Sequence, residues 1–266
     1  MKESLKKNKL AQYMIKRGWS FTAIRGKKEQ SRKIKEQERK YHLNDRDCVF
    51  TGVHGVKFYL PEYKRDVVQK DIVLNADYYE ADGLKKAEEY VKKKGNLVNA
   101  LDIGANIGSH TLYFMKKWGI KKVWSFEPVP STFAILRKNV EINGLEERVV
   151  LENVGVGEKE YHASVKEEIK DNRGGTSIEE DSAGTFVVKT IDSYHLSDVS
   201  LMKIDTEGYE LKVLQGAEAT IVKNRPVILA EIADANIEKV KSMMKEWNYK
   251  KTRHSGENYI FIPAEL

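Results

Sequence analysis

A glycine-bent turn between an apolar run and a helical pattern most constrains the fold of this chain. Segment 99–108 reads NALDIGANIG, and Glu127 follows nineteen residues later, at the end of a second apolar run. A Cβ atom at Gly104 or Gly108 would hinder close approach of a ligand to the backbone. Amide groups at the start of the next helix attract anions, and a carboxylate at the neighbouring strand tip accepts hydrogen bonds from ribose hydroxyls. This combination is typical of an open α/β sheet that binds an adenosine-bearing cofactor.

The spacing of the glycines distinguishes two classes of cofactor. A dinucleotide usually binds at G-x-G-x-x-G, whereas here Gly104 and Gly108 enclose Asn106 in a G-x-N-x-G pattern. Asp102 adds a negative charge that would repel a pyrophosphate but attract the amino group of an amino acid. S-adenosylmethionine has such an amino group, a carboxylate for the helix N-terminus and a ribose for Glu127. We therefore predict S-adenosylmethionine, the alternative being a strand–turn–helix unit without a ligand.

Four segments together resemble the FkbM family of class I S-adenosylmethionine-dependent methyltransferases. They are Asp102–Gly108, Phe126–Pro128, Asn139–Asn143 and Lys203–Glu210, the last of which reads KIDTEGYE and is the most specific. The resemblance covers about residues 70–262. It implies a Rossmann-like, seven-stranded α/β sheet with a C-terminal β-hairpin. It also implies O-methylation of hydroxyl groups on sugars, nucleotide sugars, polysaccharide precursors or polyketides.

Further cofactor contacts are predicted from position alone. Ligands of such sheets collect at the carboxyl ends of the strands, so Asn153 and Val154 are expected to flank the adenine ring. Thr111, one turn into the first helix, is a candidate for the methionine carboxylate. Glu80 follows a tyrosine, and this pair resembles a family element that closes over the cofactor; the tyrosine ring would face the sulfonium. A plain structural role is the alternative for each residue.

Three carboxylates at strand ends are the candidate catalytic groups, namely Asp205, Glu207 and Glu231. A sugar hydroxyl has a pKa far above neutral, so its methylation needs a general base or a metal ion. We favour a carboxylate base and assign no metal. If a divalent ion such as Mg²⁺ were required, Asp205, Glu231 and Asp234 would offer the oxygen ligands that it prefers. Acids at strand ends are also frequently solvated loop residues.

Two basic residues near these motifs have open roles. Lys203 lies within an apolar strand, so its ammonium group either reaches the pocket or extends to solvent. His110 follows the glycine turn and could act as a base, although we expect it to point outward. The polar stretch 171–177 is a candidate for binding an activated sugar or, equally, a loop tip.

Charge is distributed unevenly along the 266 residues. Residues 1–40 contain fourteen Lys or Arg against four Asp or Glu, so the pI of 9.0 reflects this segment. We predict a basic, mainly helical extension over 1–47, a lead-in hairpin and helix over 48–96, and the methyltransferase domain over 97–266. The basic segment keeps an RNA-modifying enzyme as an alternative, but no RNA-binding module is recognisable and we do not expect a nucleic-acid partner. Self-association or contact with an anionic membrane surface are other roles for it.

The cysteine content and the hydropathy of the chain restrict the cellular compartments in which we expect it. Cys48 is the only cysteine, so no intrachain disulfide can form and a reducing compartment is expected. Neither an apolar run of about 18 residues nor a secretory signal is evident. We therefore expect a cytoplasmic enzyme without a transmembrane segment that acts on a small-molecule or glycan acceptor.

Alternating apolar runs and helical patterns follow residue 97. Strands are predicted at 97–103, 122–127, 149–153, 201–205 and 226–232, and helices at 109–118, 131–143, 210–223 and 236–247. One helix is predicted over 66–94, with short hairpins over 48–62 and 249–262. Within 154–200, β-like runs at 161–165 and 185–191 predict a hairpin insertion around the polar stretch 171–177.

Overall fold

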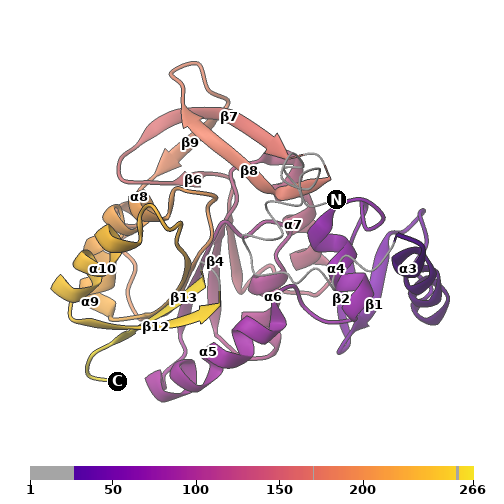
Figure 1. Cartoon of the computed structure of the whole chain (residues 1–266), viewed down its shortest axis with the longest axis horizontal. Helices are drawn as coiled ribbons and strands as arrows, with labels where there is room; N and C mark the ends of the chain where they lie inside the picture. Colours follow the sequence, from indigo (N-terminus) through magenta and orange to yellow (C-terminus); the bar gives the residue numbers. More distant parts are fainter. Residues whose placement is uncertain (1–26, 170, 256–257) are drawn as a thin grey trace.

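The computed structural model describes residues 27–169, 171–255 and 258–266, and its centre is a seven-stranded sheet. The strand order is β12-β13-β11-β10-β3-β4-β5 (Figure 1). Strand β13 pairs antiparallel with β11 and β12, whereas β11, β10, β3, β4 and β5 pair parallel with one another. The predicted seven-stranded α/β sheet is therefore present. Its strands are β3 (Asn99–Ile103), β4 (Lys122–Phe126), β5 (Val149–Glu152), β10 (Val199–Ile204), β11 (Val227–Glu231), β12 (Tyr249–Ser255) and β13 (Asn258–Pro263).

Helices cover both faces of this sheet because its strands are apolar on both sides. Ala100 and Leu201 belong to the buried cluster that includes α5 (Ala81–Lys94), α6 (Ser109–Lys116) and α7 (Pro130–Glu141). Their chain neighbours Leu101 and Met202 belong to a second cluster on the opposite face, as expected for side chains that alternate along a strand. That face is covered by α8 (Glu210–Gln215), α9 (Glu218–Asn224) and α10 (Ile237–Glu246).

The order of the strands determines where a ligand can bind. From β3 the chain continues through β4 and β5 toward one edge, and β10 and β11 later fill the other side of β3. The reversal point lies between β3 and β10, and ligands of open α/β sheets bind outside the carboxyl ends of the strands at this point. The segments 104–108 and 205–209 follow these two strands directly.

The predicted helix over 66–94 is wrong, because the chain forms two helices there. The first, α4 (Val67–Asn75), begins after Asp66, whose side chain accepts a hydrogen bond from the amide of Gln69. It ends at Ala76, which has a left-handed φ of 49°. The side chain of Tyr78 is then buried in the core before α5 begins. The apolar pattern of the sequence continues through this segment, so it gave no sign of the break between the two helices.

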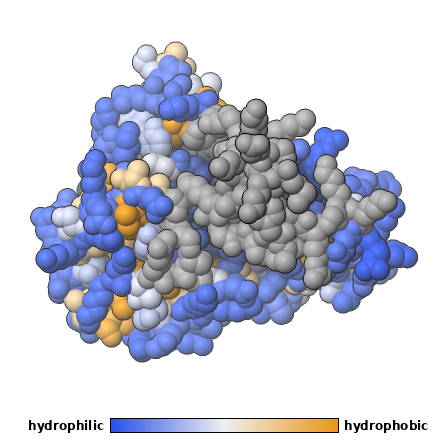
Figure 2. Space-filling view, viewed as in Figure 1, coloured by the Kyte–Doolittle hydropathy of each residue, from blue (hydrophilic) through white to orange (hydrophobic). Residues whose placement is uncertain are grey.

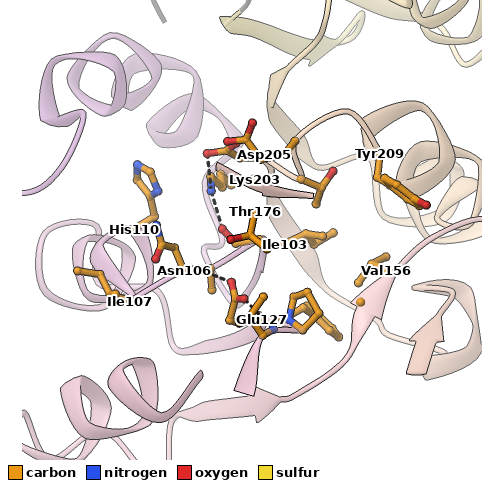
Figure 3. Close-up of a pocket in the computed structure, with 18 of the residues that line it drawn as sticks. Ile103, Asn106, Ile107, His110, Glu127, Val156, Thr176, Lys203, Asp205 and Tyr209 are labelled. Atoms are coloured by element: carbon orange, nitrogen blue, oxygen red, sulfur yellow. Dashed lines mark hydrogen bonds and ion pairs between the residues drawn. The ribbon is translucent and has the colours of Figure 1, made fainter. Parts of the chain in front are cut away.

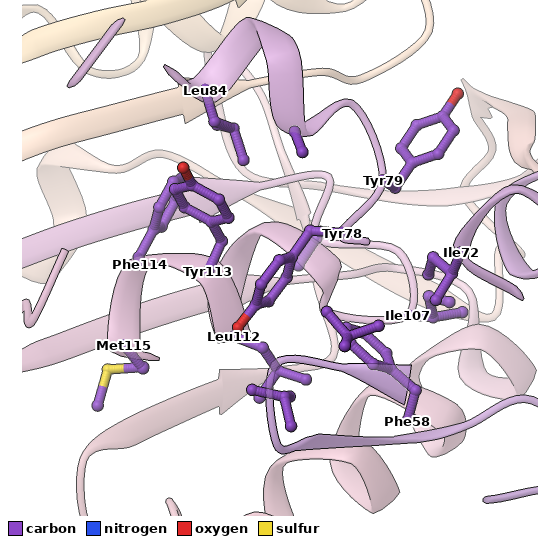
Figure 4. Packing of buried hydrophobic residues seen from close by; sticks show 14 of the residues in the cluster. Phe58, Ile72, Tyr78, Tyr79, Leu84, Ile107, Leu112, Tyr113, Phe114 and Met115 are labelled. Carbon is purple, nitrogen blue, oxygen red and sulfur yellow. The ribbon is translucent and has the colours of Figure 1, made fainter. Parts of the chain in front are cut away.

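The segment before α5 packs against α6 rather than standing apart from the sheet. Phe58 of β2 (Val56–Tyr59), Ile72 of α4 and Tyr78 lie with Leu112 and Tyr113 of α6 in one buried cluster (Figure 4). Tyr78 makes edge-to-face contacts with Phe58 and Tyr113, at centroid distances of 5.9 and 4.9 Å. The remaining elements of this part are α3 (Lys27–Tyr41) and β1 (Val49–Val53), which pairs with β2.

A second sheet, in the order β6-β9-β7-β8, covers the carboxyl end of the main sheet (Figure 1). The predicted pairing of the runs 161–165 and 185–191 is present, but the polar stretch between them is a strand rather than a loop tip. It lies in β8, which pairs with β7 as far as Ile169 and Asn172. The elements are β6 (Gly155–Val156), β7 (Tyr161–Ile169), β8 (Asn172–Glu180), β9 (Phe186–Lys189) and a short 3₁₀ turn, Asp192–Tyr194.

Outside the core, the described surface is mainly hydrophilic, as the visible face in Figure 2 shows. Val165 and Val222 are the large hydrophobic side chains that stay exposed among the described residues. No helix in the described ranges combines the length and apolarity that a membrane crossing requires. Residues 1–26, which carry most of the predicted basic extension, lie outside the described part of the chain.

Candidate active site

A pocket opens at the strand reversal point between β3 and β10. Its empty volume is about 850 Å³, including space open to solvent. Its walls come from the turns after β3, β4 and β10, from 154–156, and from side chains of β8 and α4. The pocket therefore lies where the sheet topology predicts a ligand.

The turn after β3 needs glycine because of its protein neighbours. Gly104 has a φ of 76°, and a Cβ atom there would lie 1.8 Å from the backbone oxygen of Asp205. Gly108 has a φ of 88°, and a Cβ atom there would lie 2.6 Å from a methyl group of Leu136. The sequence argument attributed both glycines to the approach of a ligand. The structure adds a different cause, namely the close packing of this turn against the β10 turn and α7.

Glu127 lies at the end of β4 with its carboxylate at the pocket (Figure 3). One carboxylate oxygen accepts a hydrogen bond from the amide of Asn106 and the other from the amide of Val129, each at 3.0 Å. These bonds hold the side chain against the glycine turn. Burial raises the pKa of Glu127 to about 7, and the two amide donors oppose that rise.

The turn after β10 is built around a buried glutamate. One carboxylate oxygen of Glu210 accepts hydrogen bonds from the amides of Thr206 and Gly208, at 3.1 and 2.9 Å. Burial raises the pKa of Glu210, and these amides lower it. The last acid of the KIDTEGYE segment thus fixes the loop that presents Asp205 and Glu207 to the pocket.

Lys203 reaches the pocket from the central strand β10. Its ammonium Nζ donates a hydrogen bond to the backbone oxygen of Gly104 at 3.1 Å and lies 3.3 Å from the carboxylate of Asp205 (Figure 3). A carboxylate oxygen of Asp102 lies 3.7 Å from the same atom. The sequence left two orientations open for this side chain, toward the pocket or toward solvent, and the structure shows the first.

Behind Lys203, a buried polar chain crosses into the sheet. The hydroxyl of Thr111 donates to Asp102 at 2.6 Å and lies 2.8 Å from the hydroxyl of Ser125. All three side chains are fully buried. Burial raises the pKa of Asp102, and the neighbouring Lys203 and Thr111 lower it.

Comparison with protein families identifies the chain. The sequence model of the family described as the Methyltransferase FkbM domain matches residues 102–251, more than half of the chain. The chain belongs to this family. The predicted resemblance is thereby confirmed, and residues 102–251 match a methyltransferase domain.

Two curated fungal proteins are similar to this FkbM family member. Methyltransferase 1 of Beauveria bassiana is 28% identical, and the match covers 44% of this chain and 57% of that protein. Methyltransferase sdnD of Sordaria araneosa is 25% identical, with 44% and 60% covered. The chain thus spans less than two thirds of the length of either relative. Among solved structures, the FkbM methyltransferase of Methylobacillus flagellatus KT is 18% identical with a TM-score of 0.47, covering 63% of this chain and 44% of that one.

Six of the predicted site residues of this FkbM family member line the pocket together. They come from the turns after β3, β4 and β10 and from the segment that follows β5. They are Gly104, Asn106, Glu127, Val154, Asp205 and Glu207.

Four of the side chains that were predicted to contact the cofactor do not line the pocket. Asp102 and Thr111 are fully buried beneath the turn and bond to each other. The exposed Asn153 uses its amide to donate to the backbone oxygens of Glu127 and Pro128. Glu80 has a φ of 54° and precedes the first residue of α5. Thr111 is corrected to a supporting position, because its buried hydroxyl bonds to Asp102 and lies beside that of Ser125. The cofactor contacts of Asp102, Asn153 and Glu80 stay predictions.

Gly108, Glu231 and Asp234 also lie outside the lining of the pocket. Gly108 is buried against Leu136, and Glu231 is buried at the end of β11. Within the described residues, no three His, Cys, Asp or Glu side chains form a group with metal-binding geometry. The set Asp205, Glu231 and Asp234 is therefore not assembled as a ligand group.

His110 is a pocket residue that the sequence analysis expected to point outward. It is buried, lines the pocket and stacks on Phe114 at a centroid distance of 6.4 Å. Thr176 and Ile178 of β8 and Val68 of α4 also line the pocket. No local motif marks these residues, because their place depends on how distant segments pack.

The corrected position of Thr111 gives a testable prediction. Thr111→Val keeps the shape of the side chain but removes the hydroxyl that donates to Asp102. We expect the free energy of unfolding to fall by about 1.5–3 kcal/mol, the usual value of a hydrogen bond to a charged group. Affinity for S-adenosylhomocysteine, measured by calorimetry, should stay unchanged. A loss of affinity without a loss of stability would instead restore Thr111 as a cofactor ligand.

Proposed function

We propose that this chain transfers a methyl group from S-adenosylmethionine to a hydroxyl group of a sugar, nucleotide sugar or polysaccharide precursor. The observation that carries the proposal is the convergence of Glu127, Asp205 and Glu207 on one pocket in a member of the FkbM family. Residues 48–96 belong to the same functional unit, because Val68 and Tyr79 line this pocket.

The polar groups of the pocket fit S-adenosylmethionine. The Glu127 carboxylate can accept hydrogen bonds from the ribose hydroxyls. The side-chain oxygen of Asn106 is buried and has no hydrogen-bond partner among the described residues, so a ligand donor would satisfy it. Phe126, Val154 and Val156 add apolar wall beside Glu127, which suits an adenine ring.

The charges of the pocket disfavour a dinucleotide. Lys203 is the only lysine or arginine among the described lining residues, and it is engaged by Gly104 and Asp205. Glu127, Asp205 and Glu207 outnumber it, so a pyrophosphate would meet net negative charge. A sulfonium ion is attracted by the same charges.

Asp205 is the group that we assign as the general base. When bound, S-adenosylmethionine supplies an electrophilic methyl group on positive sulfur and leaves as S-adenosylhomocysteine. The acceptor hydroxyl loses its proton to the Asp205 carboxylate while its oxygen bonds to the methyl carbon. The proton then passes from Asp205 to solvent, which restores the carboxylate. Glu207 lies in the same turn and lines the same pocket, where it can accept a hydrogen bond from a second acceptor hydroxyl.

The rest of the pocket lining suits a neutral acceptor with several hydroxyls. It combines Val68 and Ile178 with the polar side chains of Thr176, Tyr79 and His110. Carboxylates accept hydrogen bonds from hydroxyls and repel phosphates. We therefore favour acceptors whose reacting hydroxyl lies away from any phosphate group.

Methylation assays with the purified full chain test the proposal. Labelled S-adenosylmethionine is supplied with glycosides, nucleotide sugars, aliphatic alcohols and transfer RNA, and products are identified by mass spectrometry. A methyl ether on a glycoside or nucleotide sugar is the expected result. Failure of the folded chain to take up labelled cofactor, or transfer only to RNA, would overturn it.

A further inference from the structure

Lys203 lines the pocket, and the sequence analysis left its role open. It projects from the strand whose six residues are all buried, and its side chain is 8% exposed. A buried ammonium group requires compensating charge. The groups that surround the Lys203 ammonium must therefore supply this charge.

The ammonium joins the two turns that form the floor of the pocket. It donates to the backbone oxygen of Gly104 in the turn after β3 and lies 3.3 Å from the carboxylate of Asp205 in the turn after β10. These turns also touch directly, since the backbone oxygen of Asp205 occupies the space beside Gly104. One cation thus fixes the side chain of Asp205 relative to the cofactor turn.

Two carboxylates share this cation. Asp102 is fully buried, and Lys203 is the largest influence that keeps its pKa from rising further. Asp205 is 15% exposed and faces the pocket. Without the cation, the two carboxylates would repel each other, and one of them would take up a proton.

We infer that Lys203 is a positioning residue for methyl transfer, which holds Asp205 as a carboxylate directed at the acceptor. This inference rests on the proposed function, in which Asp205 takes the hydroxyl proton. Lys203 itself forms and breaks no covalent bond. It sets the orientation of Asp205 and the lowest pH at which that carboxylate can act.

The test removes the ammonium without leaving a buried charge alone, because a single Lys203→Met substitution would leave Asp102 uncompensated. The main variant is therefore Lys203→Met with Asp102→Asn. Asp102→Asn alone is the matched control, since it retains the contact between Lys203 and Asp205. Lys203→Arg, which keeps the cation, is the rescue variant.

Kinetics provide the first readout. The double variant should lose at least about tenfold in kcat, and the acid limb of its kcat profile should move up by about one pH unit. The acceptor KM and the affinity for S-adenosylhomocysteine should stay within about threefold of the wild type. Asp102→Asn should keep the acid limb at or below its wild-type position, because it removes a like charge near Asp205. Lys203→Arg should recover part of kcat. Equal kcat and equal acid limbs in the double variant and in Asp102→Asn would overturn the inference.

A second readout does not depend on turnover. Crystal structures of the double variant and of Asp102→Asn, each with S-adenosylhomocysteine, should show the Asp205 carboxylate turned away from position 203 in the double variant only. An unchanged Asp205 in both would overturn the role of Lys203. If the wild type bound the product but methylated no hydroxyl, the proposed function would fail while this structural comparison still tested Lys203.

Discussion

Glu127→Gln should weaken binding of S-adenosylhomocysteine by about ten- to a hundredfold while the fold is retained. The carboxylate is the group at the end of β4 that can accept from both ribose hydroxyls, and glutamine can offer only one acceptor oxygen in its place. Loss of a charge-assisted hydrogen bond costs about 1.5–3 kcal/mol, which sets the size of the effect. Calorimetry on the purified variant measures it, with circular dichroism as the check on folding.

The same carboxylate should make cofactor affinity depend on pH. Burial raises the pKa of Glu127 to about 7 from an ordinary value of 4.5. Below about pH 7 the group is increasingly protonated, so wild-type affinity should fall by about tenfold for each further unit of pH. Between 4.5 and about 7 the folded chain holds a proton that the unfolded chain has lost. The contribution of this group to stability therefore decreases as pH rises through that window.

Glu152→Gln is the matched control. Glu152 ends the adjacent strand β5, its carboxylate accepts from the hydroxyl of Tyr194, and it does not line the pocket. This variant should keep the wild-type affinity for the cofactor product and the pH dependence of that affinity. Glu127→Gln should have a weaker affinity that no longer falls below about pH 7. Wild-type affinity that stays constant between about pH 5.5 and 7.5 would contradict the ribose role of Glu127.

The main sheet could be predicted because its strands and helices alternate with clear local signals. Every strand of the main sheet that was predicted between 97 and 232 is present within two residues at each end. The helix predicted over 210–223 is instead two short helices, α8 and α9, separated at Gly216 and Ala217. The helix predicted from 131 begins one residue earlier, with Pro130 in its first turn.

The inward face of α6 could not be predicted, and this explains the errors at His110 and Thr111. Every residue from Ser109 to Met115 is buried, so the helix has no polar side that would reveal its orientation. Thr111 turns toward the sheet and Asp102, while His110 turns toward the pocket. Sequence spacing placed both residues near the cofactor turn but could not say which of them faces it.

The roof of the pocket depends on contacts between distant segments. The backbone oxygen of Asp171 accepts a hydrogen bond from the amide of Val67, which joins the β7–β8 hairpin to α4. The polar composition of 171–177 gave no sign of this contact or of the pairing of β8 with β7. Side chains such as Thr176 therefore entered the site without any local signal.

Asp205→Asn should have the largest effect on turnover. The variant keeps the size of the side chain and a polar contact for Lys203, but an amide cannot accept the hydroxyl proton. General-base catalysis is worth about 10²- to 10⁴-fold, so we expect kcat to fall by about a thousandfold. Affinity for S-adenosylhomocysteine should stay within about threefold, because the role that we propose for Asp205 concerns the acceptor rather than the cofactor. Steady-state kinetics and calorimetry on the same preparation separate these two quantities.

Glu207→Gln and Glu231→Gln are the comparisons that make this assignment specific. Glu207 lines the pocket in the same turn as Asp205, so its loss should cost less than about tenfold in kcat if it only binds the acceptor. Glu231 is buried outside the lining of the pocket and should leave kcat nearly unchanged. A thousandfold loss in Glu207→Gln together with an active Asp205→Asn would transfer the role of base to Glu207. The proton of the acceptor hydroxyl would then pass to Glu207. The contact between Lys203 and Asp205 would in that case stabilise the cofactor turn.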